Sequence, residues 1–256
     1  MPARDLDLLE EAAREAGEIA RSFWRDDPQV WDKGGDDPVS EADFAVDTHL
    51  KDRLLAARPE YGWVSEETVD DLSRLSAERV FIVDPIDGTR AFVAGEKTWA
   101  HSLAVVEQGA VIAACVFLPV REKMYLSAKR QGASLNGNKL QASNRNAVKG
   151  ATVLSPKVSF RDEHWRNGAP AVERHFRPSL AYRLALIGEG RFDAMLTLRP
   201  AWEWDIAAGA LIAQEAGATV TDRHGETLTF NSPARQTAGV VAASPGVHEG
   251  LSRELR

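Results

Sequence analysis

The apolar positions in the first half of the chain predict two helices and then a series of strands. Residues 6–24 carry apolar side chains every three or four positions, which is typical of an amphipathic helix. A second helix is expected to begin near Ser40, because Ser40 and Asp43 have the spacing of a capping box and a helical apolar pattern follows. Strands are then predicted at residues 61–65, 80–84, 99–106, 110–118, 124–128 and 133–137.

In the second half, predicted helices and strands alternate. The helices are expected at 179–188, at about 205–217 and after Ser244-Pro245, where serine suits the cap and proline the first turn. The strands are expected at 151–155, 193–198, 218–221 and 239–243. The polar stretch 136–150 separates the two patterns. We therefore predict an N-terminal α+β domain at 1–143 and a C-terminal α/β domain at 144–256.

Composition narrows the class of protein. The chain has 256 residues, 44% of them hydrophobic, which is enough for a sizeable core. Its net charge of −7 does not favour binding to nucleic acid, whose phosphates attract an excess of Lys and Arg. The single cysteine, Cys115, excludes an internal disulfide and suits a reducing compartment. The N-terminus is acidic and no apolar run reaches the ~20 residues that a membrane helix needs. We expect a cytoplasmic protein without a membrane partner.

The stretch FIVDPIDGTR (81–90) carries the strongest candidate chemistry. A lone DPIDG is often only a turn, but here Asp84 and Asp87 end an apolar run, and ligands collect at the carboxyl ends of strands. Pro85 stiffens the link, and the carbonyl of Ile86 offers a third oxygen between the two acids. Three oxygen donors in four residues suit a hard cation such as Mg²⁺.

Other acids have simple alternative explanations. Glu66 and Glu67 could be a solvated turn pair, and Asp205, in AWEWDIAAG, could be a helix N-cap. An aspartyl-nucleophile phosphatase would need D-x-D-G-T, but Pro85 stands where the nucleophile should be. The six histidines show no ligand spacing, so zinc is not expected, and no Ser-His-Asp or Cys-His arrangement stands out.

Taken together, FIVDPIDGTRAF and WEWDIAAG resemble the two signatures of the inositol monophosphatase superfamily, D-P-[IL]-D-G-T and W-D-x-A-A-G. VSEET resembles the family's G-E-E segment with Ser65 in place of Gly, and DDPVSEAD resembles its V-T-x-x-D segment. The resemblance covers most of the chain. It implies a five-layer αβαβα sandwich, a Mg²⁺-dependent and Li⁺-sensitive phosphomonoesterase, and a homodimer.

The resemblance also implies roles for individual residues. Two Mg²⁺ ions bridged by Asp84 would be held by Glu66, Asp84, the carbonyl of Ile86, Asp87 and Asp205. Asp43 and Thr89 would orient and deprotonate the attacking water, and Glu67 would assist a metal-activated water or a third ion. Lys33 would match an upstream family lysine. Substrate contacts would come from Gly88, Thr89, Arg90 and Arg183.

The substrate is harder to predict. TRAF (89–92) and PSLA (178–181) differ from the T-N-F and G-x-A-A segments that inositol phosphatases usually carry. Arg90 and Arg183 stand where the family's nucleotidases often have lysines, although each could be a surface charge. We therefore predict a 3′(2′),5′-bisphosphate nucleotidase, with inositol-1-phosphate as the alternative substrate and histidinol phosphate as the third. A metal-binding regulatory protein is the alternative from another class.

Overall fold

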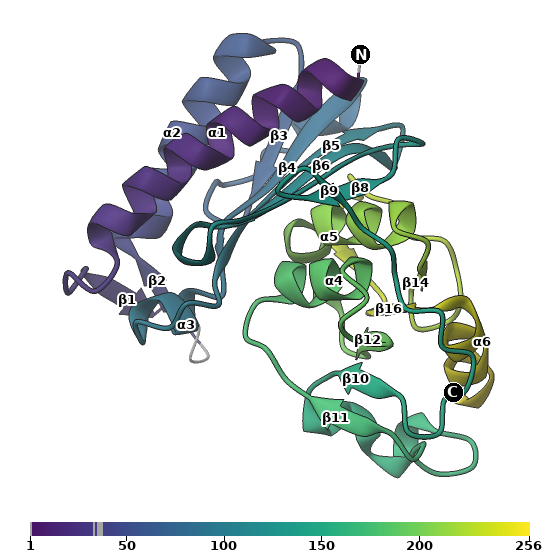
Figure 1. The fold of residues 1–256 in the computed structure, drawn as a ribbon. Helices are drawn as coiled ribbons and strands as arrows, with labels where there is room; N and C mark the ends of the chain where they lie inside the picture. Colours follow the sequence, from purple (N-terminus) through teal and green to yellow (C-terminus); the bar gives the residue numbers. More distant parts are fainter. Residues whose placement is uncertain (1, 33, 35–37) are drawn as a thin grey trace.

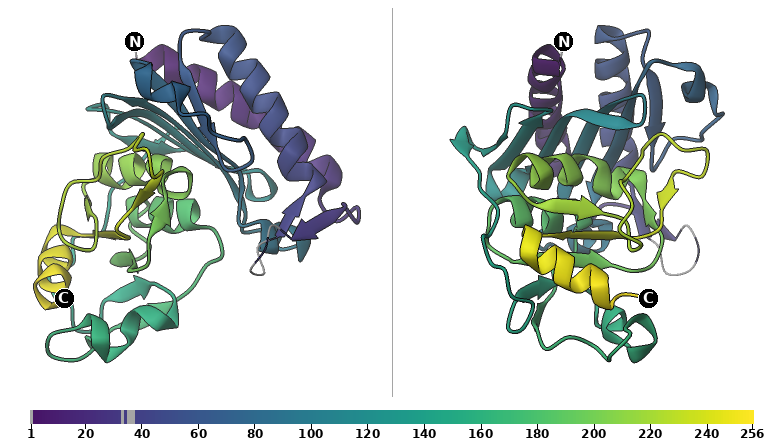
Figure 2. Two further views of the ribbon diagram at one scale, coloured as in Figure 1. Left: turned by 180° about the vertical axis from the view of Figure 1, so that it is seen from behind. Right: turned by 90° about the vertical axis from the view of Figure 1, so that its right-hand side faces the viewer.

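The computed structural model describes residues 2–32, 34 and 38–256, and its elements stack in five layers (Figure 1). Two long helices form the first layer, α1 (Pro2–Phe23) and α2 (Glu41–Ala57). A seven-stranded sheet is the second layer, and α4 (Leu180–Gly188) with α5 (Glu203–Glu215) forms the third. A five-stranded sheet and α6 (Pro245–Glu254) complete the stack (Figure 2). The predicted αβαβα sandwich is confirmed.

The seven-stranded sheet is a meander after its first pair. Its strands in spatial order are β3 (Gly62–Ser65), β4 (Arg79–Asp87), β5 (Ala100–Glu107), β6 (Ala110–Leu118), β7 (Lys123–Ala128), β8 (Ala133–Leu135) and β9 (Asn138–Lys139). Only β3 and β4 are parallel. The predicted turn between β5 and β6 has positive φ at both Gln108 and Gly109, as a two-residue hairpin turn of type I′ requires.

The five-stranded sheet mixes parallel and antiparallel pairs. Its spatial order is β11 (Glu173–His175), β10 (Thr152–Leu154), β12 (Ala194–Thr197), β16 (Val240–Ala243) and β14 (Thr219–Thr221). Two small ribbons lie outside these sheets, β1 (Val30–Asp32) with β2 (Pro38–Ser40), and β13 (Ala201–Trp202) with β15 (Gln236–Thr237). A short helix, α3 (Thr89–Val93), follows β4, and single 3₁₀ turns lie at Ser73–Ser76, Pro119–Arg121, Lys157–Phe160 and Asp162–His164.

Both faces of the first sheet are buried. Along β4, Phe81 and Val83 pack with the apolar residues of α1 and α2, whereas Val80 and Ile82 pack with those of α4 and α5. A strand covered on both sides reads as a continuous apolar run, which is why 80–84 is apolar throughout. Cys115 lies fully buried on the α1 side, and burial raises the pKa of its thiol.

The middle helices join the two halves of the chain. One core cluster contains residues of the first sheet, of α4 and α5, and of the second sheet. The predicted boundary falls between β9, which ends at Lys139, and β10, which begins at Thr152. The two-domain division itself stays a prediction. Among the residues that the structure describes, no helix combines the length and hydrophobicity needed to cross a bilayer.

Candidate functional site

A β-bulge brings the first two acids of the site together. Asp84 pairs with Ser102 and Asp87 with Ala100, so three steps along β4 match two steps along β5. In a regular strand, residues three apart point to opposite faces of the sheet. The extra residue removes this alternation. Asp84 and Asp87 therefore both contribute a carboxylate oxygen to one cluster.

His101 lies behind this bulge. Its Nδ1 donates a hydrogen bond to the carbonyl of Pro85, one of the two residues between the acids in the bulge. The ring is fully buried, with Trp99 and Phe117 at centroid distances of 5.6 and 6.3 Å. Burial lowers the pKa of His101 to about 4, so the ring is neutral at pH 7. Sequence reasoning missed His101, because its contact with β4 is not visible from residue spacing.

The third acid comes from the C-terminal half. Asp205 lies in the first turn of α5, which begins at Glu203 after the N-cap Trp202. The alternative explanation of Asp205 as an N-cap is therefore wrong. Ser102, the β5 partner of Asp84, donates a 2.7 Å hydrogen bond to the carbonyl of Trp204. This contact fixes the start of α5 beside β4. Sequence reasoning did not identify Ser102 either.

The three carboxylates form a compact cluster. Asp84, Asp87 and Asp205 each offer one oxygen, and these atoms lie within 4.8 Å of one another. Among the residues that the structure describes, Oδ1 of Asp84 is buried without a hydrogen-bond partner. Burial raises the pKa of Asp84 well above its usual range, and the nearby charges of Glu66, Asp87, Asp205 and Asp43 raise it further. A bound cation would offset the repulsion between these buried carboxylates. Because all the ligand atoms are oxygens, the cluster suits a hard divalent metal ion.

Asp87 has a second set of contacts. Its carboxylate accepts hydrogen bonds from Ser179 Oγ at 2.6 Å, from the Ala181 amide at 2.6 Å and from the Leu180 amide at 3.2 Å. These donors belong to the beginning of α4, where Ser179 is the N-cap. Burial raises the pKa of Asp87 to about 6, although these hydrogen bonds act to lower it. One acid therefore joins the cluster and holds the N-terminus of a helix.

Asp43 and Thr89 are in contact, as a pair that handles one water would need. Oδ2 of Asp43 accepts hydrogen bonds from the amide of Ser40 at 2.9 Å and from its hydroxyl at 2.6 Å. Oδ1 of the same residue lies 3.1 Å from Thr89 Oγ1, which is also 3.1 Å from the carbonyl of Ile86. Burial is the main cause that raises the pKa of Asp43 to about 6. Asp43 therefore caps α2 with one oxygen and faces the site with the other.

Glu66 and Glu67 directly follow β3, beside the end of β4. Their segment is fastened by Asp47 of α2, a residue that the sequence reasoning missed. The carboxylate of Asp47 accepts hydrogen bonds from the hydroxyl of Ser65 and, at 2.7 Å, from that of Thr68. Asp47 lies four residues after Asp43 on a buried helix face, and a second acid at that spacing could have flagged it.

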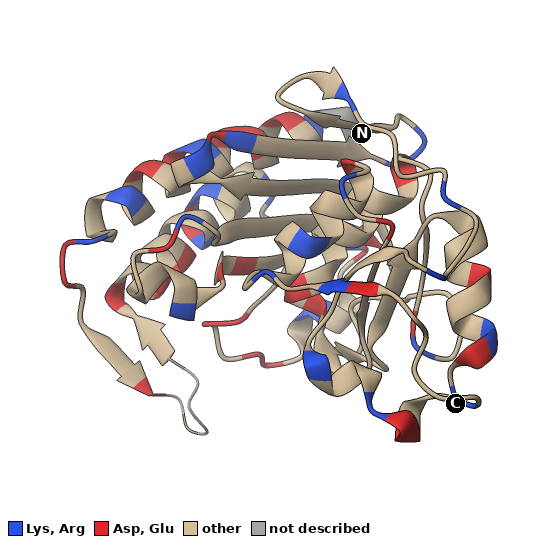
Figure 3. Cartoon of the chain, turned by 60° about the horizontal axis from the view of Figure 1, so that its bottom comes forward, with Lys and Arg blue, Asp and Glu red and all other residues tan. Residues whose placement is uncertain are grey.

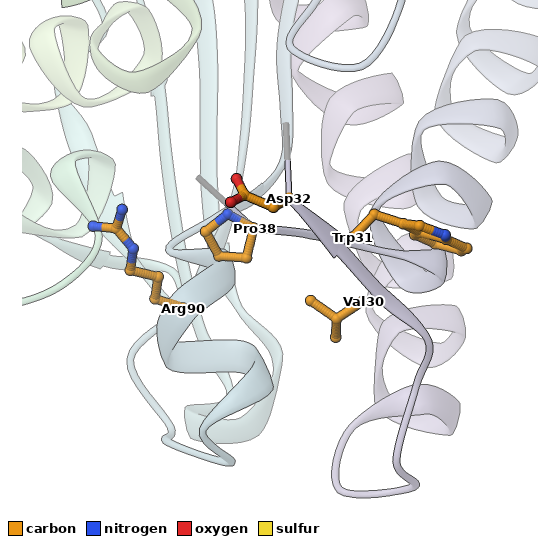
Figure 4. Close-up of a pocket in the computed structure, with 5 residues that line it drawn as sticks. All are labelled: Val30, Trp31, Asp32, Pro38 and Arg90. Carbon is orange, nitrogen blue, oxygen red and sulfur yellow. The ribbon is translucent and has the colours of Figure 1, made fainter. Parts of the chain in front are cut away.

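The residues expected to contact substrate differ in their exposure and in their contacts. Gly88 has a positive φ of 101°, which favours glycine, at the start of α3. Arg90 is exposed and lines a cavity of about 350 Å³ with Val30, Trp31, Asp32 and Pro38 (Figure 4). Lys33 lies outside the described residues.

The guanidinium of Arg183 bonds mainly to the backbone of the segment before α4. It is buried, it donates to the carbonyl of Arg177 and, at 3.1 Å, to that of Pro178, and it stacks over Phe176 at 4.4 Å. These contacts hold the segment that leads into α4. The roles assigned to individual site residues, including substrate contact by Arg183, stay predictions.

Lys and Arg positions are interspersed with Asp and Glu positions along the chain in Figure 3. Acidic and basic positions alternate along the outer helices there, whereas nucleic-acid binding needs clustered Lys and Arg. The expectation that the protein has no nucleic-acid partner stays a prediction.

Comparison with known proteins gives a consistent result. Residues 3–256 match the Inositol monophosphatase family. The Inositol-1-monophosphatase of Rhizobium meliloti is 33% identical over 237 residues, 86% of each chain. The Nus factor SuhB of Pseudomonas aeruginosa is 35% identical over 233 residues, 85% of this chain and 84% of that protein.

Solved structures agree. The suhB protein from Bartonella henselae superimposes with a TM-score of 0.84 at 25% identity, covering 98% of this chain and 97% of the other. The IMPase of Thermotoga maritima gives a TM-score of 0.83 at 26% identity, covering 99% and 96%. Sequence, fold and acid cluster thus lead to one conclusion: the chain belongs to the inositol monophosphatase family and is a metal-dependent phosphatase.

Proposed function

We propose that this phosphatase hydrolyses inositol-1-phosphate and that Mg²⁺ is its metal. The observation that carries the substrate is the 33% identity, over 86% of both chains, to a protein named Inositol-1-monophosphatase. The prediction of a bisphosphate nucleotidase rested on the segments TRAF (89–92) and PSLA (178–181), on the spacing around Pro200 and on two arginines. The guanidinium of Arg183 donates hydrogen bonds to the carbonyls of residues 177 and 178. Of the two arginines, Arg90 is therefore the better candidate for contact with a second phosphate. The alternative substrate therefore becomes the first choice, and histidinol phosphate stays third.

The residues that would hold Mg²⁺ are the acids of the cluster together with Glu66 and the carbonyl of Ile86. The buried Oδ1 of Asp84 supports this fit, because a bound cation stabilises a buried carboxylate oxygen that has no hydrogen-bond donor among the described residues. Glu67 would serve a third, weaker ion. When bound, Mg²⁺ neutralises the phosphate and lowers the pKa of a coordinated water.

The chain itself supplies orientation and a proton acceptor. Thr89 can donate to Oδ1 of Asp43, and its hydroxyl oxygen can then accept a hydrogen bond from the attacking water. The raised pKa of Asp43, about 6, makes its carboxylate a better proton acceptor than an exposed aspartate. We propose that Gly88 and Thr89 direct backbone amides at the phosphate. Phosphoryl transfer depends mainly on such positioning and charge neutralisation.

The test compares phosphate release from inositol-1-phosphate, adenosine 3′,5′-bisphosphate and histidinol phosphate, with Mg²⁺ and with EDTA. We expect kcat/KM to be at least about tenfold higher for inositol-1-phosphate, a gap that one well-placed polar contact can supply. Activity should disappear with EDTA and in Asp84→Asn. A higher kcat/KM for the bisphosphate nucleotide would restore the nucleotidase.

A regulatory function is the second candidate, since relatives named Nus factor SuhB match over a similar share of the chain. Overall likeness does not separate the two candidates, but the acid cluster favours catalysis. If the purified protein binds Mg²⁺ yet releases phosphate from none of the three esters, the phosphatase proposal for these substrates is overturned.

A further inference from the structure

We propose that Arg74 and Glu203, both buried, position Asp205 for metal binding through one polar network that crosses between the two halves of the chain. The network consists of Asp70, Arg74, Glu203, Asn231 and Ser232, and we call it the Arg74–Glu203 network. The inference depends on the proposed function, because it takes Asp205 as a metal ligand. It assigns the network a positioning role, since none of its members belongs to the acid cluster.

The first half of the network lies a few residues after the Glu66–Glu67 segment. Arg74, in the 3₁₀ turn Ser73–Ser76, is 1% exposed, and Asp70 pairs with it. Nη2 of Arg74 lies 2.8 Å from Oδ2 of Asp70, and Nε lies 3.1 Å from both carboxylate oxygens. A buried, multiply bonded ion pair of this kind holds the guanidinium in one orientation.

The same guanidinium reaches the C-terminal half. Nη1 of Arg74 donates to the side-chain oxygen of Asn231, and Nη2 donates to the carbonyl of Ser232 at 3.0 Å. These partners are more than 150 positions further along the chain. Arg74 therefore fixes the Asn231–Ser232 segment relative to the loop that follows the two glutamates.

Glu203 fastens that segment to α5. It is the first residue of the helix, it is 0% exposed, and it lies two positions before Asp205. Its carboxylate accepts hydrogen bonds from the amide of Asn231 at 2.6 Å, and from the amide and hydroxyl of Ser232 at 3.0 and 2.6 Å. Its own amide donates to the carbonyl of Arg235 at 2.9 Å. The segment 231–235 thus holds the first turn of α5 at both side chain and backbone.

This arrangement gives Asp205 two separate anchors. One is the hydrogen bond from Ser102 to Trp204, next to Asp84. The other is the Arg74–Glu203 network, which ties the same helical turn to the segment after Glu66. Metal ligands must be held to within about 0.5 Å, and loss of a residue that orients a ligand typically costs about 10- to 100-fold in metal affinity. The network should therefore control Mg²⁺ affinity more than the chemistry at saturating Mg²⁺.

The test uses two mild variants and a matched control. Ser232→Ala removes one hydrogen bond to Glu203, and Glu203→Gln removes its charge and one acceptor. Arg79→Met is the control for a general loss of stability, because it breaks a partly exposed ion pair, 2.6 Å from Nη2 to Glu107, at the end of β4 remote from the acid cluster. Mg²⁺ affinity is measured by isothermal titration calorimetry without substrate, and kcat is measured against Mg²⁺ concentration.

We expect the Mg²⁺ dissociation constant to rise about tenfold in Glu203→Gln and by about threefold in Ser232→Ala, while kcat at saturating Mg²⁺ falls less than about threefold. Arg79→Met should lower the melting temperature and leave Mg²⁺ affinity unchanged. Unchanged affinity in both network variants, or an equal loss in the control, overturns the inference. If the wild-type protein hydrolyses inositol-1-phosphate with Mg²⁺ in that case, the proposed function still stands. If the wild type binds no Mg²⁺, both are overturned.

Discussion

Ser179 donates a 2.6 Å hydrogen bond from its hydroxyl to Oδ2 of Asp87. Ser179 caps α4 in the C-terminal half, and Asp87 ends β4 in the N-terminal half. The contact therefore joins the two halves at the acid cluster. It also means that Asp87 cannot move without disturbing the start of α4.

The first prediction concerns Asp87→Asn. Loss of one negative charge from the cluster should reduce kcat by more than about a hundredfold, because the metal and the transition state lose a charged partner. An amide oxygen at this position still accepts a hydrogen bond from Ser179, so the variant should remain folded. Steady-state kinetics and circular dichroism check both parts. Asp52→Asn, an exposed change on α2, is the control and should behave like wild type. Near-normal turnover in Asp87→Asn would contradict the ligand assignment.

Thr89 provides the second prediction. Thr89→Ala removes the hydroxyl between Asp43 and the carbonyl of Ile86, and should lower kcat by about 10²- to 10⁴-fold, the usual range for loss of acid–base assistance. Thr89→Ser keeps the hydroxyl and should retain most of the activity. Comparison of the two variants at saturating substrate separates loss of the hydroxyl from loss of the methyl group. Equal activity in both would exclude a role for the hydroxyl.

The third prediction is a pH dependence that comes from His101. The pKa of His101 is its ordinary 6.5 in the unfolded chain and about 4 in the folded protein. Between pH 4 and pH 6.5 the unfolded state therefore binds more protons than the folded state. The stability contributed by the neutral ring is therefore complete above pH 6.5 and is lost as the pH falls towards 4. A difference of this size corresponds to about 3 kcal/mol.

His101→Asn isolates this effect, because an asparagine amide can still donate to the carbonyl of Pro85 but does not titrate. Urea unfolding of both proteins gives the free energy of unfolding at each pH. The wild-type value minus the variant value should decrease by about 3 kcal/mol between pH 7 and pH 4. The carboxylates titrate in both proteins and cancel in this difference. A difference that does not vary with pH would show that the ring titrates in the folded protein as it does in the unfolded chain, which would contradict the lowered pKa.

Arg90 gives the fourth prediction. It lines an open cavity with Trp31 and Asp32, next to the predicted phosphate site at Gly88 and Thr89. Arg90→Ala should change kcat/KM for inositol-1-phosphate by less than about threefold, as expected for an exposed charge. Adenosine 3′,5′-bisphosphate, with its second phosphate, should lose more than about tenfold in kcat/KM, because a second anionic group would lose its cation. A larger loss with inositol-1-phosphate would place its phosphate on Arg90.

The fifth prediction tests the close contact of α4 and α5. A Cβ on Gly209 would lie 2.6 Å from Cβ of Leu184, so Gly209→Ala forces the helices apart. Overpacking costs about 1–3 kcal/mol, partly offset by about 1 kcal/mol from better helix propensity. We expect a net loss of up to about 2 kcal/mol in the free energy of unfolding. Gln214→Ala, on the exposed side of α5, should cause no loss.

Much of the fold and part of the site follow from local patterns. Periodicity located α1, the predicted β5–β6 hairpin and the Ser-Pro start of α6, because each depends on neighbouring residues. The signatures around Asp84 and Asp205 identified the acids, but the resemblance, not the patterns, gave the stacking of the layers.

The remaining features depend on contacts between distant segments. The spacing of Asp84 and Asp87 does not show a bulge until β5 is placed beside β4. His101 and Ser102 matter because of the residues they face across that pair, and Glu203 because of a loop about 30 positions later. Such partners cannot be identified from a single sequence, since any buried polar residue has several possible hydrogen-bond partners.

The burial of Cys115 has a practical consequence. The chain's single thiol is enclosed between α1 and the sheet, with Sγ 3.4 Å from Sδ of Met124, and its raised pKa keeps it protonated. Thiol-reactive probes should therefore not label the native protein. Cysteines introduced by Asp52→Cys and Gln214→Cys would be the only sites to label, one on an outer helix and one on a middle helix. Spectroscopic distances between such labels would report directly whether the layers shift when a cation is added.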